Sequence, residues 1–360
     1  MEQYWIWLSS VEGIGPKRFY ALLSRYEDAR NVWDALGQGE DFSWLGHAVE
    51  QNLRAARDER RFFALFAGLE RTGVRAVTRL SEAYPGRLTN IFNPPPTLYV
   101  RGAGPLEMER AIAVVGSRRC TRDGQRAARE IARGLTREGA TVVSGLARGV
   151  DTAAHLGAVE ADGRTVAVLG CGVDVVYPPE NAKLVERILE LGGAIVSEYV
   201  PGTVPAPGNF PARNRILSGL CAGTLIVEGA EGSGAMITVN LALEQGRDVF
   251  AVPGSIFSPA SSMPNRLIVE GATPVLSEWE ILEYYQWASR PAAAPRKSPD
   301  PALGAEERQL VDALVQQEMS FDELAAATKI PSGKLNSYLT MLELQGIIVK
   351  APGGLFRAYQ

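Results

Sequence analysis

The chain has 360 residues, of which 46% are hydrophobic and 22% charged. This near-average globular composition excludes a disordered or fibrous protein, and the length predicts two or three domains. No run of about 18 apolar residues occurs, so we expect no transmembrane helix and no membrane partner. The N-terminus lacks the basic region and cleavage site of a signal peptide, so we expect a cytoplasmic protein.

Cysteine and histidine are scarce. Cys120, Cys171 and Cys221 lie about 50 residues apart without a Cys-x-x-Cys pair, which predicts buried free thiols and no disulfide framework. The same spacing does not support a zinc site. Because the chain has only two histidines, we expect no metal centre, and we assign no cofactor.

Residues 1–72 carry apolar side chains at helical spacing, which predicts an N-terminal helical domain. The turn at residues 13–16 reads Gly-Ile-Gly-Pro, where glycine permits a tight turn and Pro16 suits the first turn of the next helix. This pattern is typical of a helix-hairpin-helix or SAM-like module. Such modules bind DNA phosphates in some proteins and other proteins elsewhere, and both interpretations stay open here.

Residues 73–287 alternate short runs rich in β-branched residues with helical stretches. Strands are expected at 112–115, 141–144, 165–169, 194–197, 225–227 and 249–252, and helices at 124–138, 182–191 and 238–244. This rhythm predicts an α/β, Rossmann-like, doubly wound and mainly parallel sheet. Such a sheet binds ligands beyond the carboxyl ends of its strands.

Residues 288–303 are rich in proline and alanine, which predicts a semi-rigid linker. Residues 304–360 follow with three expected helices and a strand–Gly-Gly–strand hairpin, the pattern of a winged helix. From Leu303 onward, five basic residues stand against seven acidic ones, a net charge of −2. Because a winged helix that reads a DNA groove is normally basic, we expect a protein contact here, or weak DNA contact at most.

The net charge of the whole chain is −4, which argues weakly against a nucleic-acid partner. The distribution argues otherwise, because residues 111–150 hold eight arginines and three acidic residues, a local net charge of +5. Such a run is usually a solvated helix face. Here the excess is all arginine and begins at a glycine turn after a strand, which favours an anion site.

Two motifs follow the first two strands of the expected parallel sheet. In the first, Gly116 lets the backbone approach a ligand, Ser117 adds a hydroxyl, and Arg118 can bind phosphate with two hydrogen bonds. The next helix should present free N–H groups to the same phosphate. In the second, residues 144–151, two glycines and Arg148 repeat this arrangement. Each motif also suits an ordinary strand-to-helix turn.

Two further motifs follow later strands. Residues 209–215 combine Arg213 and Arg215 with Phe210, which could stack on a base with about 1–3 kcal/mol. The alternative is a capped helix start with Phe210 buried. Residues 228–235 form a glycine-rich turn that can supply a second group of N–H donors.

Asp151 and His155 are four residues apart, so they share one helix face, as an acid–base pair or metal ligands would. We expect the structural alternative, with Asp151 as a helix N-cap and His155 packed and hydrogen-bonded. The chain has no P-loop, no complete dinucleotide fingerprint and no nucleophile elbow. Arginines without general bases bind phosphates rather than act on them, so we assign no catalytic residue and expect no enzyme.

The chain resembles the bacterial DNA-processing protein A family (DprA, also called Smf) in six motifs that occur in order: VGSR, SGLARGVDTAAH, TVAVLGCGVDVVYPPEN, FPARNRI, GSGAMIT and GRDVFAVPG. The resemblance covers most of residues 75–285, including the segment 84–102, and both flanking modules fit it loosely. It implies a Rossmann-like domain that binds single-stranded DNA. It also implies protection of incoming DNA during natural transformation, loading of the RecA recombinase, and a homodimer formed through that domain.

The same resemblance implies a set of strand-binding residues. They are Gly116, Ser117, Arg118, Arg148, Phe210, Arg213, Asn214, Arg215, Gly232 and Ser233. A single strand would follow this rim with its phosphates on arginines, and sequence preference would be weak. The chain departs from the family at residues 261–268, where Pro264 removes a backbone donor, so we expect no contact through that N–H.

Two other functions stay open. The turn at 228–235 resembles the P-G-G-x-G-T-x-x-E site of cytokinin-activating phosphoribohydrolases, which share a related Rossmann-like fold. The position of their glutamate falls on Thr238, so the catalytic carboxylate would be missing. A nucleotide-sensing module is the third interpretation. Release of free base from a nucleoside monophosphate would indicate the enzyme, and tight mononucleotide binding without turnover would indicate the sensor.

Overall fold

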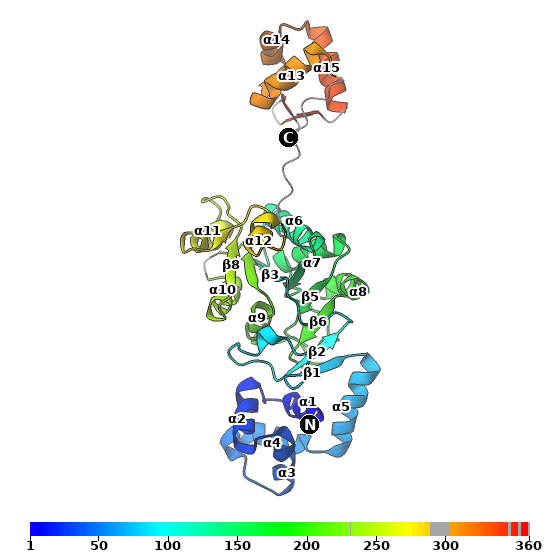
Figure 1. Ribbon diagram of the computed structural model, residues 1–360, viewed down its shortest axis with the longest axis vertical. Helices are drawn as coiled ribbons and strands as arrows, with labels where there is room; N and C mark the ends of the chain where they lie inside the picture. Colours follow the sequence, from blue (N-terminus) through cyan, green and yellow to red (C-terminus); the bar gives the residue numbers. More distant parts are fainter. Residues whose placement is uncertain (231, 289–302, 345–346, 352–353, 359–360) are drawn as a thin grey trace. The chain divides into compact units, whose positions relative to one another are not determined.

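The computed structural model describes residues 1–230, 232–288, 303–344, 347–351 and 354–358 (Figure 1). Its internal contacts divide the chain into two compact units, Met1–Ser289 and Arg290–Gln360. The expected linker at 288–303 lies almost wholly outside the described residues. The expected boundary after residue 72 falls inside the first unit and stays a prediction.

The first unit is built on a nine-stranded sheet in the order β1-β2-β6-β5-β4-β3-β7-β8-β9. The strands are β1 (Arg75–Thr78), β2 (Thr97–Arg101), β3 (Ala111–Val115), β4 (Thr141–Ser144), β5 (Thr165–Val168), β6 (Ala194–Ser197), β7 (Gly223–Ile226), β8 (Asp248–Ala251) and β9 (Thr273–Pro274). From β6 to β9 all neighbours are parallel, whereas β1 and β2 add an antiparallel edge. The doubly wound, mainly parallel sheet is confirmed, and each expected strand is correct within two residues.

Helices cover both faces of this sheet. They are α6 (Arg122–Arg137), α7 (Val150–Glu160), α8 (Ala182–Glu190), α9 (Asn209–Gly219), α10 (Gly234–Glu244), α11 (Ser262–Val269) and α12 (Glu278–Tyr284). Alternate residues of a strand point to opposite faces. Accordingly, Ile112 and Val114 of β3 share a core with α6 and α7, whereas Ala113 and Val115 share one with α9 and α10 (Figure 1).

The strand order reverses between β3 and β7. The chain proceeds from β3 through β4 and β5 to β6 in one direction, and then returns to place β7 on the other side of β3. Ligands of doubly wound sheets bind beyond the carboxyl ends of the strands at such a reversal. The loops that follow β3 and β7 therefore define where a site is expected.

Five helices precede the sheet: α1 (Glu2–Ser10), α2 (Pro16–Tyr26), α3 (Ala29–Gly37), α4 (His47–Ala56) and α5 (Glu59–Thr72). They form their own apolar core, as predicted for the helical module. Ile6 and Leu69 also share a core with Tyr99 of β2, and the Ser9 hydroxyl donates to Thr97 Oγ1 at 2.8 Å. The helical module is thus packed onto the β1–β2 edge of the sheet.

The second unit is a winged helix, as predicted. Its elements are α13 (Ala305–Gln316), β10 (Met319–Ser320), α14 (Phe321–Thr328), α15 (Ser332–Leu344), β11 (Ile348–Lys350) and β12 (Leu355–Ala358), with sheet order β10-β12-β11. The short strand β10 was not predicted. In the described part of the chain, no helix has both the length and the apolar character that crossing a membrane requires.

Candidate functional site

The loops after β3, β4, β5, β6 and β7 meet at the carboxyl edge of the sheet, and the expected site residues lie on them or on the helices that follow. Gly116, Ser117 and Arg118 follow β3, and Arg148 follows β4. Phe210 to Arg215 lie in α9, and Gly232 and Ser233 precede α10. The fold therefore brings all four motifs to one edge, although they span more than a hundred residues of sequence.

Four side chains form a cation–aromatic strip at this edge: Arg118, Phe210, Tyr177 and Arg148. The guanidinium carbon of Arg118 lies 5.4 Å from the centre of the Phe210 ring, and the Tyr177 and Phe210 rings are 5.5 Å apart. Arg118, Arg148 and Tyr177 are exposed, and Phe210 is half-buried. Sequence analysis missed Tyr177, although it is the aromatic residue in the stretch that follows β5.

Arg148 is held by an acidic neighbour. Its guanidinium forms two hydrogen bonds with Glu180, at 2.5 and 3.1 Å, and Glu180 raises the pKa of Arg148 above its ordinary value. Both side chains are exposed, and exposed pairs of this kind contribute little to stability. A phosphate can therefore replace the Glu180 carboxylate on Arg148 at small cost.

The arginine run of residues 111–150 is divided between two locations. Arg118 and Arg148 reach the carboxyl edge, but Arg129 and Arg133 of α6 pair with Glu160 and Glu130 on the helix surface. On α6, the alternative of a solvated helix face therefore describes Arg129 and Arg133, whereas an anion site at the glycine turn stays a prediction for Arg118 and Arg148.

Arg213 lies beneath the edge rather than on it, and its expected role as a strand contact stays a prediction. Its side chain is only 4% exposed and donates to the Val168 carbonyl oxygen at the end of β5. A Cβ at Gly145 would meet its guanidinium nitrogens at 2.5 Å. Burial lowers the pKa of Arg213, and the nearby Asp151 carboxylate opposes that shift.

Arg215 is also directed inward, because this side of α9 crosses the end of β6. It is 9% exposed and makes two hydrogen bonds to the Glu198 carboxylate, at 2.9 and 2.6 Å. Its Nε donates to the carbonyl oxygen of Asn93 at 3.0 Å. Arg215 therefore links three segments of the protein, and four of its five N–H groups donate to partners within it.

Several backbone N–H groups after β3 donate to partners within the protein. Ser117 donates to the Glu228 carbonyl oxygen at 2.7 Å, and Thr121 donates its N–H to the Glu228 carboxylate at 2.7 Å. The Thr121 hydroxyl also donates to that carboxylate and accepts from Gly124, which caps α6. The prediction that the N-terminus of α6 binds a phosphate is therefore wrong, because the Glu228 carboxylate lies there. The cation of this loop is the exposed Arg118 side chain.

The smaller residues have structural positions of different kinds. A Cβ at Gly116 would lie 2.6 Å from Val150, so this glycine allows β3 to pack against α7. Gly232 has a φ of +78° and open space around it. Ser233 is the N-cap of α10, and its hydroxyl lies 3.6 Å from Met263 Sδ. Asn214 is half-buried in α9.

Asp151 and His155 on α7 have structural roles, as expected, but Asp151 does not cap the helix. Gly149 is the N-cap, and Asp151 accepts from the Ala147 N–H in the preceding loop, so its predicted capping role is wrong. Burial raises the pKa of Asp151 to about 6, opposed by Arg213.

His155 is buried and hydrogen-bonded, as predicted. Its Nδ1 lies 2.8 Å from Thr165 Oγ1, and the Thr165 hydroxyl donates to the Val142 carbonyl oxygen, so the ring must donate from Nδ1. Burial lowers its pKa to about 3. Within the described residues, no three His, Cys, Asp or Glu side chains are grouped to hold a metal ion.

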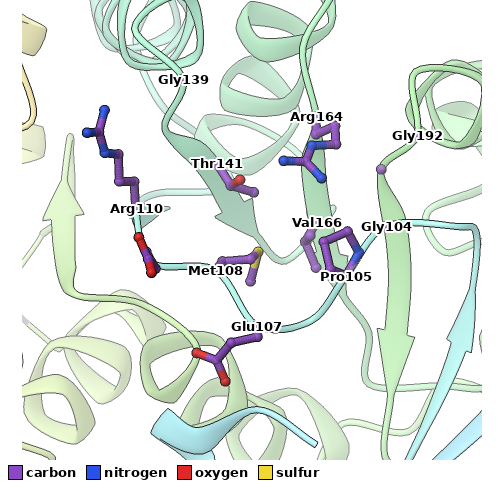
Figure 2. A pocket seen from close by; sticks show the side chains of 12 residues that line it. Gly104, Pro105, Glu107, Met108, Arg110, Gly139, Thr141, Arg164, Val166 and Gly192 are labelled. Carbon is purple, nitrogen blue, oxygen red and sulfur yellow. The ribbon is translucent and has the colours of Figure 1, made fainter. Parts of the chain in front are cut away.

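A separate cavity of about 230 Å³ lies at the opposite, amino edge of β4 and β5 (Figure 2). Met108, Thr141 and Val166 line it, and the Arg110 side chain points away from Thr141 and Val166. Arg110 instead donates to the Trp287 carbonyl oxygen at 3.2 Å. None of the expected site residues belongs to this cavity.

The fold and the site define a Rossmann-like protein that offers cations and aromatic rings at the carboxyl edge of its sheet, in a chain that also contains a helical module and a winged helix. The family model described as DNA recombination-mediator protein A matches residues 75–286, and that of the DprA winged helix domain matches residues 293–354. The chain belongs to the DNA recombination-mediator protein A family.

Individual relatives agree with this membership. Protein Smf of Synechocystis is 32% identical over 98% of this chain and 97% of its own length. The X-ray structure of DprA from Streptococcus pneumoniae superposes with a TM-score of 0.64 at 33% identity, covering 79% of this chain and 98% of that one. A structure of DNA processing protein A from Helicobacter pylori, described for its single-stranded DNA binding mode, gives a TM-score of 0.53 at 27% identity over 59% of this chain and 95% of that one.

Proposed function

We propose that this chain is a recombination mediator that binds single-stranded DNA at the carboxyl edge of its parallel sheet. The cation–aromatic strip is the observation that carries the proposal. Proteins that hold single strands combine cations for the phosphates with aromatic rings on which bases stack. Arg118 and Arg148 supply the first, and Phe210 and Tyr177 supply the second.

The other proposed site residues shape this path. Gly116 and Ser117 hold Arg118 at the end of β3. Gly232 and Ser233 precede α10, whose first turn has neither an acidic residue nor a capping bond from the Ser233 side chain, so it can receive a phosphate. Asn214 lies one turn from Phe210 on α9. Arg213 and Arg215 position α9 and the neighbouring loops from below.

Binding of this kind requires no bond to be broken, and we propose that the protein is not an enzyme. The strip contains no general base, and Thr238, at the position of the phosphoribohydrolase glutamate, is buried in α10. We propose further that the bound strand is protected and passed to RecA during natural transformation. The exposed apolar side chains Val269 and Leu276, at the β9 end of the sheet, suit the proposed homodimer contact.

The test is fluorescence anisotropy of a labelled oligo-dT strand in a salt series, with wild type and Arg118→Ala. Arg129→Ala is the matched control, because Arg129 is paired with Glu160 on α6. We expect Arg118→Ala to lose about 1.5–3 kcal/mol of binding free energy, as for charge-assisted hydrogen bonds, and to reduce the salt slope by about 0.7. Duplex DNA should compete poorly. Displacement of the strand by low concentrations of AMP would favour the nucleotide-sensing or phosphoribohydrolase alternatives instead.

A further inference from the structure

A groove of about 1350 Å³ lies within the first unit, between the N-terminal helices and the sheet. Residues 9–18, from the end of α1 to the start of α2, form one wall. Residues 92–93 and 96–97, Glu198–Val200 and the first turn of α9 form the other, with Ile237 and Leu241 of α10 beside them. No residue of the cation–aromatic strip lines this groove, and of the other expected site residues only Arg215 does.

The groove presents aromatic rings and cations to solvent. Phe92 is 78% exposed and Trp44 is 42% exposed, and the Arg25 guanidinium lies 5.6 Å from the Trp44 ring. Lys17 and Arg18 are exposed in the first turn of α2, which contains no acidic residue. This is again the combination that holds single strands, with bases on rings and phosphates on cations.

The two walls are fixed relative to each other. The Ser9 hydroxyl donates to Thr97 Oγ1 at 2.8 Å, and the Arg79 guanidinium lies 5.6 Å from the Tyr20 ring. Arg215 holds the carbonyl oxygen of Asn93, the residue after Phe92, and neutralises Glu198 in the lining. The groove is therefore present before any ligand arrives, and most of the cost of forming it is already met by folding.

The groove adjoins the cation–aromatic strip at the first turn of α9. Asn209, Pro211 and Ala212 line it, and Phe210, which belongs to the strip, lies between them in the first turn of α9. We infer that the groove is a second segment of the single-strand path, leading from the strip to the turn between α1 and α2. Bases stack on Phe92 and Trp44, and phosphates lie near Lys17 and Arg18. This inference rests on the proposed function and extends it.

The test uses anisotropy with two labelled oligo-dT strands, of about 6 and about 20 nucleotides, since single-strand sites of this size class are common. Phe92→Ala and Trp44→Ala should weaken binding of the long strand by about 5- to 100-fold and leave the short strand unchanged. Phe63→Ala is the matched control, because Phe63 is 68% exposed on α5 outside the groove lining. Lys17→Gln with Arg18→Gln, both surface changes, should reduce the salt slope for the long strand only.

The outcomes separate the groove from the strip. If Arg118→Ala weakens both strands while the groove variants leave the long strand unchanged, the groove inference is overturned and the proposed function stands. If Arg118→Ala changes neither strand, the proposed function itself fails. Equal losses for both strand lengths in folded Phe92→Ala protein, checked by circular dichroism, would also overturn the inference, because they would place Phe92 in the short-strand site.

Discussion

Single residues at the carboxyl edge differ in how far their charge is already satisfied. Arg213 and Arg215 are buried and hydrogen-bonded, and Arg148 is exposed but paired with Glu180. Arg118 faces the Phe210 ring instead of a carboxylate. A single strand can therefore bind Arg118 without breaking an ion pair, whereas it must displace Glu180 to reach Arg148.

Glu180→Gln should increase single-strand affinity roughly two- to fivefold at low salt, because the amide competes less well than a carboxylate for Arg148. The gain should shrink as salt rises, and anisotropy across a salt series measures it. Glu190→Gln is the control, since Glu190 pairs with Arg187 at the other end of α8 and should change nothing. A weaker affinity in Glu180→Gln would mean that Glu180 orients Arg148 for binding.

His155 makes the stability of the protein depend on pH. Burial lowers its pKa to about 3, below the 6.5 of the exposed ring, so the unfolded state binds a proton that the folded state excludes. Stability is then lost as pH falls below 6.5. Between pH 7 and about 4.5 the loss is about 2–3 kcal/mol.

His155→Gln should remove this contribution, so the free-energy difference between wild type and variant should shrink by that amount at the lower pH. Asp151 has the opposite sign, because its raised pKa of about 6 makes stability fall as pH rises from about 4 to 6. Asp151 is present in both wild type and variant, so its contribution cancels when their free energies of unfolding are compared. Urea unfolding at the two pH values measures the effect, and a pH-independent difference would show that His155 already titrates normally in the folded state.

At the scale of elements, the loops after β3 and β4 pack tightly against each other. Gly149, the N-cap of α7, has a φ of +79°, and a Cβ there would run into the Ser117 carbonyl oxygen. The Val150 N–H donates to that same oxygen at 3.2 Å. The position of Arg118, directly after Ser117, therefore depends on the absence of a side chain in a different loop.

Gly149→Ala should lower both stability and single-strand affinity. Gly139→Ala is the matched control, because Gly139 has a φ of +81° but open space at its Cβ. Both variants place a Cβ at a positive φ, which is strained for any residue with a side chain, and only Gly149→Ala adds the collision with Ser117. Equal melting temperatures and equal affinities for the two variants would contradict the proposed coupling between the loops.

The central strands could be predicted from sequence because they are buried on both faces and read as continuous β-branched runs, such as residues 111–115. The edge strands β1 and β9 could not, since they are short and their polar and proline residues carry no such pattern. The motifs located the correct edge of the sheet. They could not show that Arg213 points at the Val168 carbonyl, or that Glu228 fills the N-terminus of α6, because both depend on contacts across the sheet.

At the scale of the whole molecule, the chain separates a unit that carries the strand site from a winged helix in which two of the five basic residues are paired with carboxylates. Lys334 on α15 pairs with Glu306 at 2.5 Å, and Arg357 on β12 lies 3.6 Å from Glu318. With a net charge of −2 over residues 303–360, the winged helix offers little to a phosphate backbone. Its contribution to strand binding should be small, which leaves its surface for a protein partner.

A chain that ends at Arg290 should therefore bind oligo-dT within about threefold of the full-length affinity, with the same salt slope. The first unit has its own cores and its own sheet, so the shortened chain should melt cooperatively at a temperature close to that of the main transition of the full chain. Anisotropy and thermal unfolding check both points. A tenfold loss of affinity with unchanged melting would place strand contacts on the winged helix, because only its removal could then account for them.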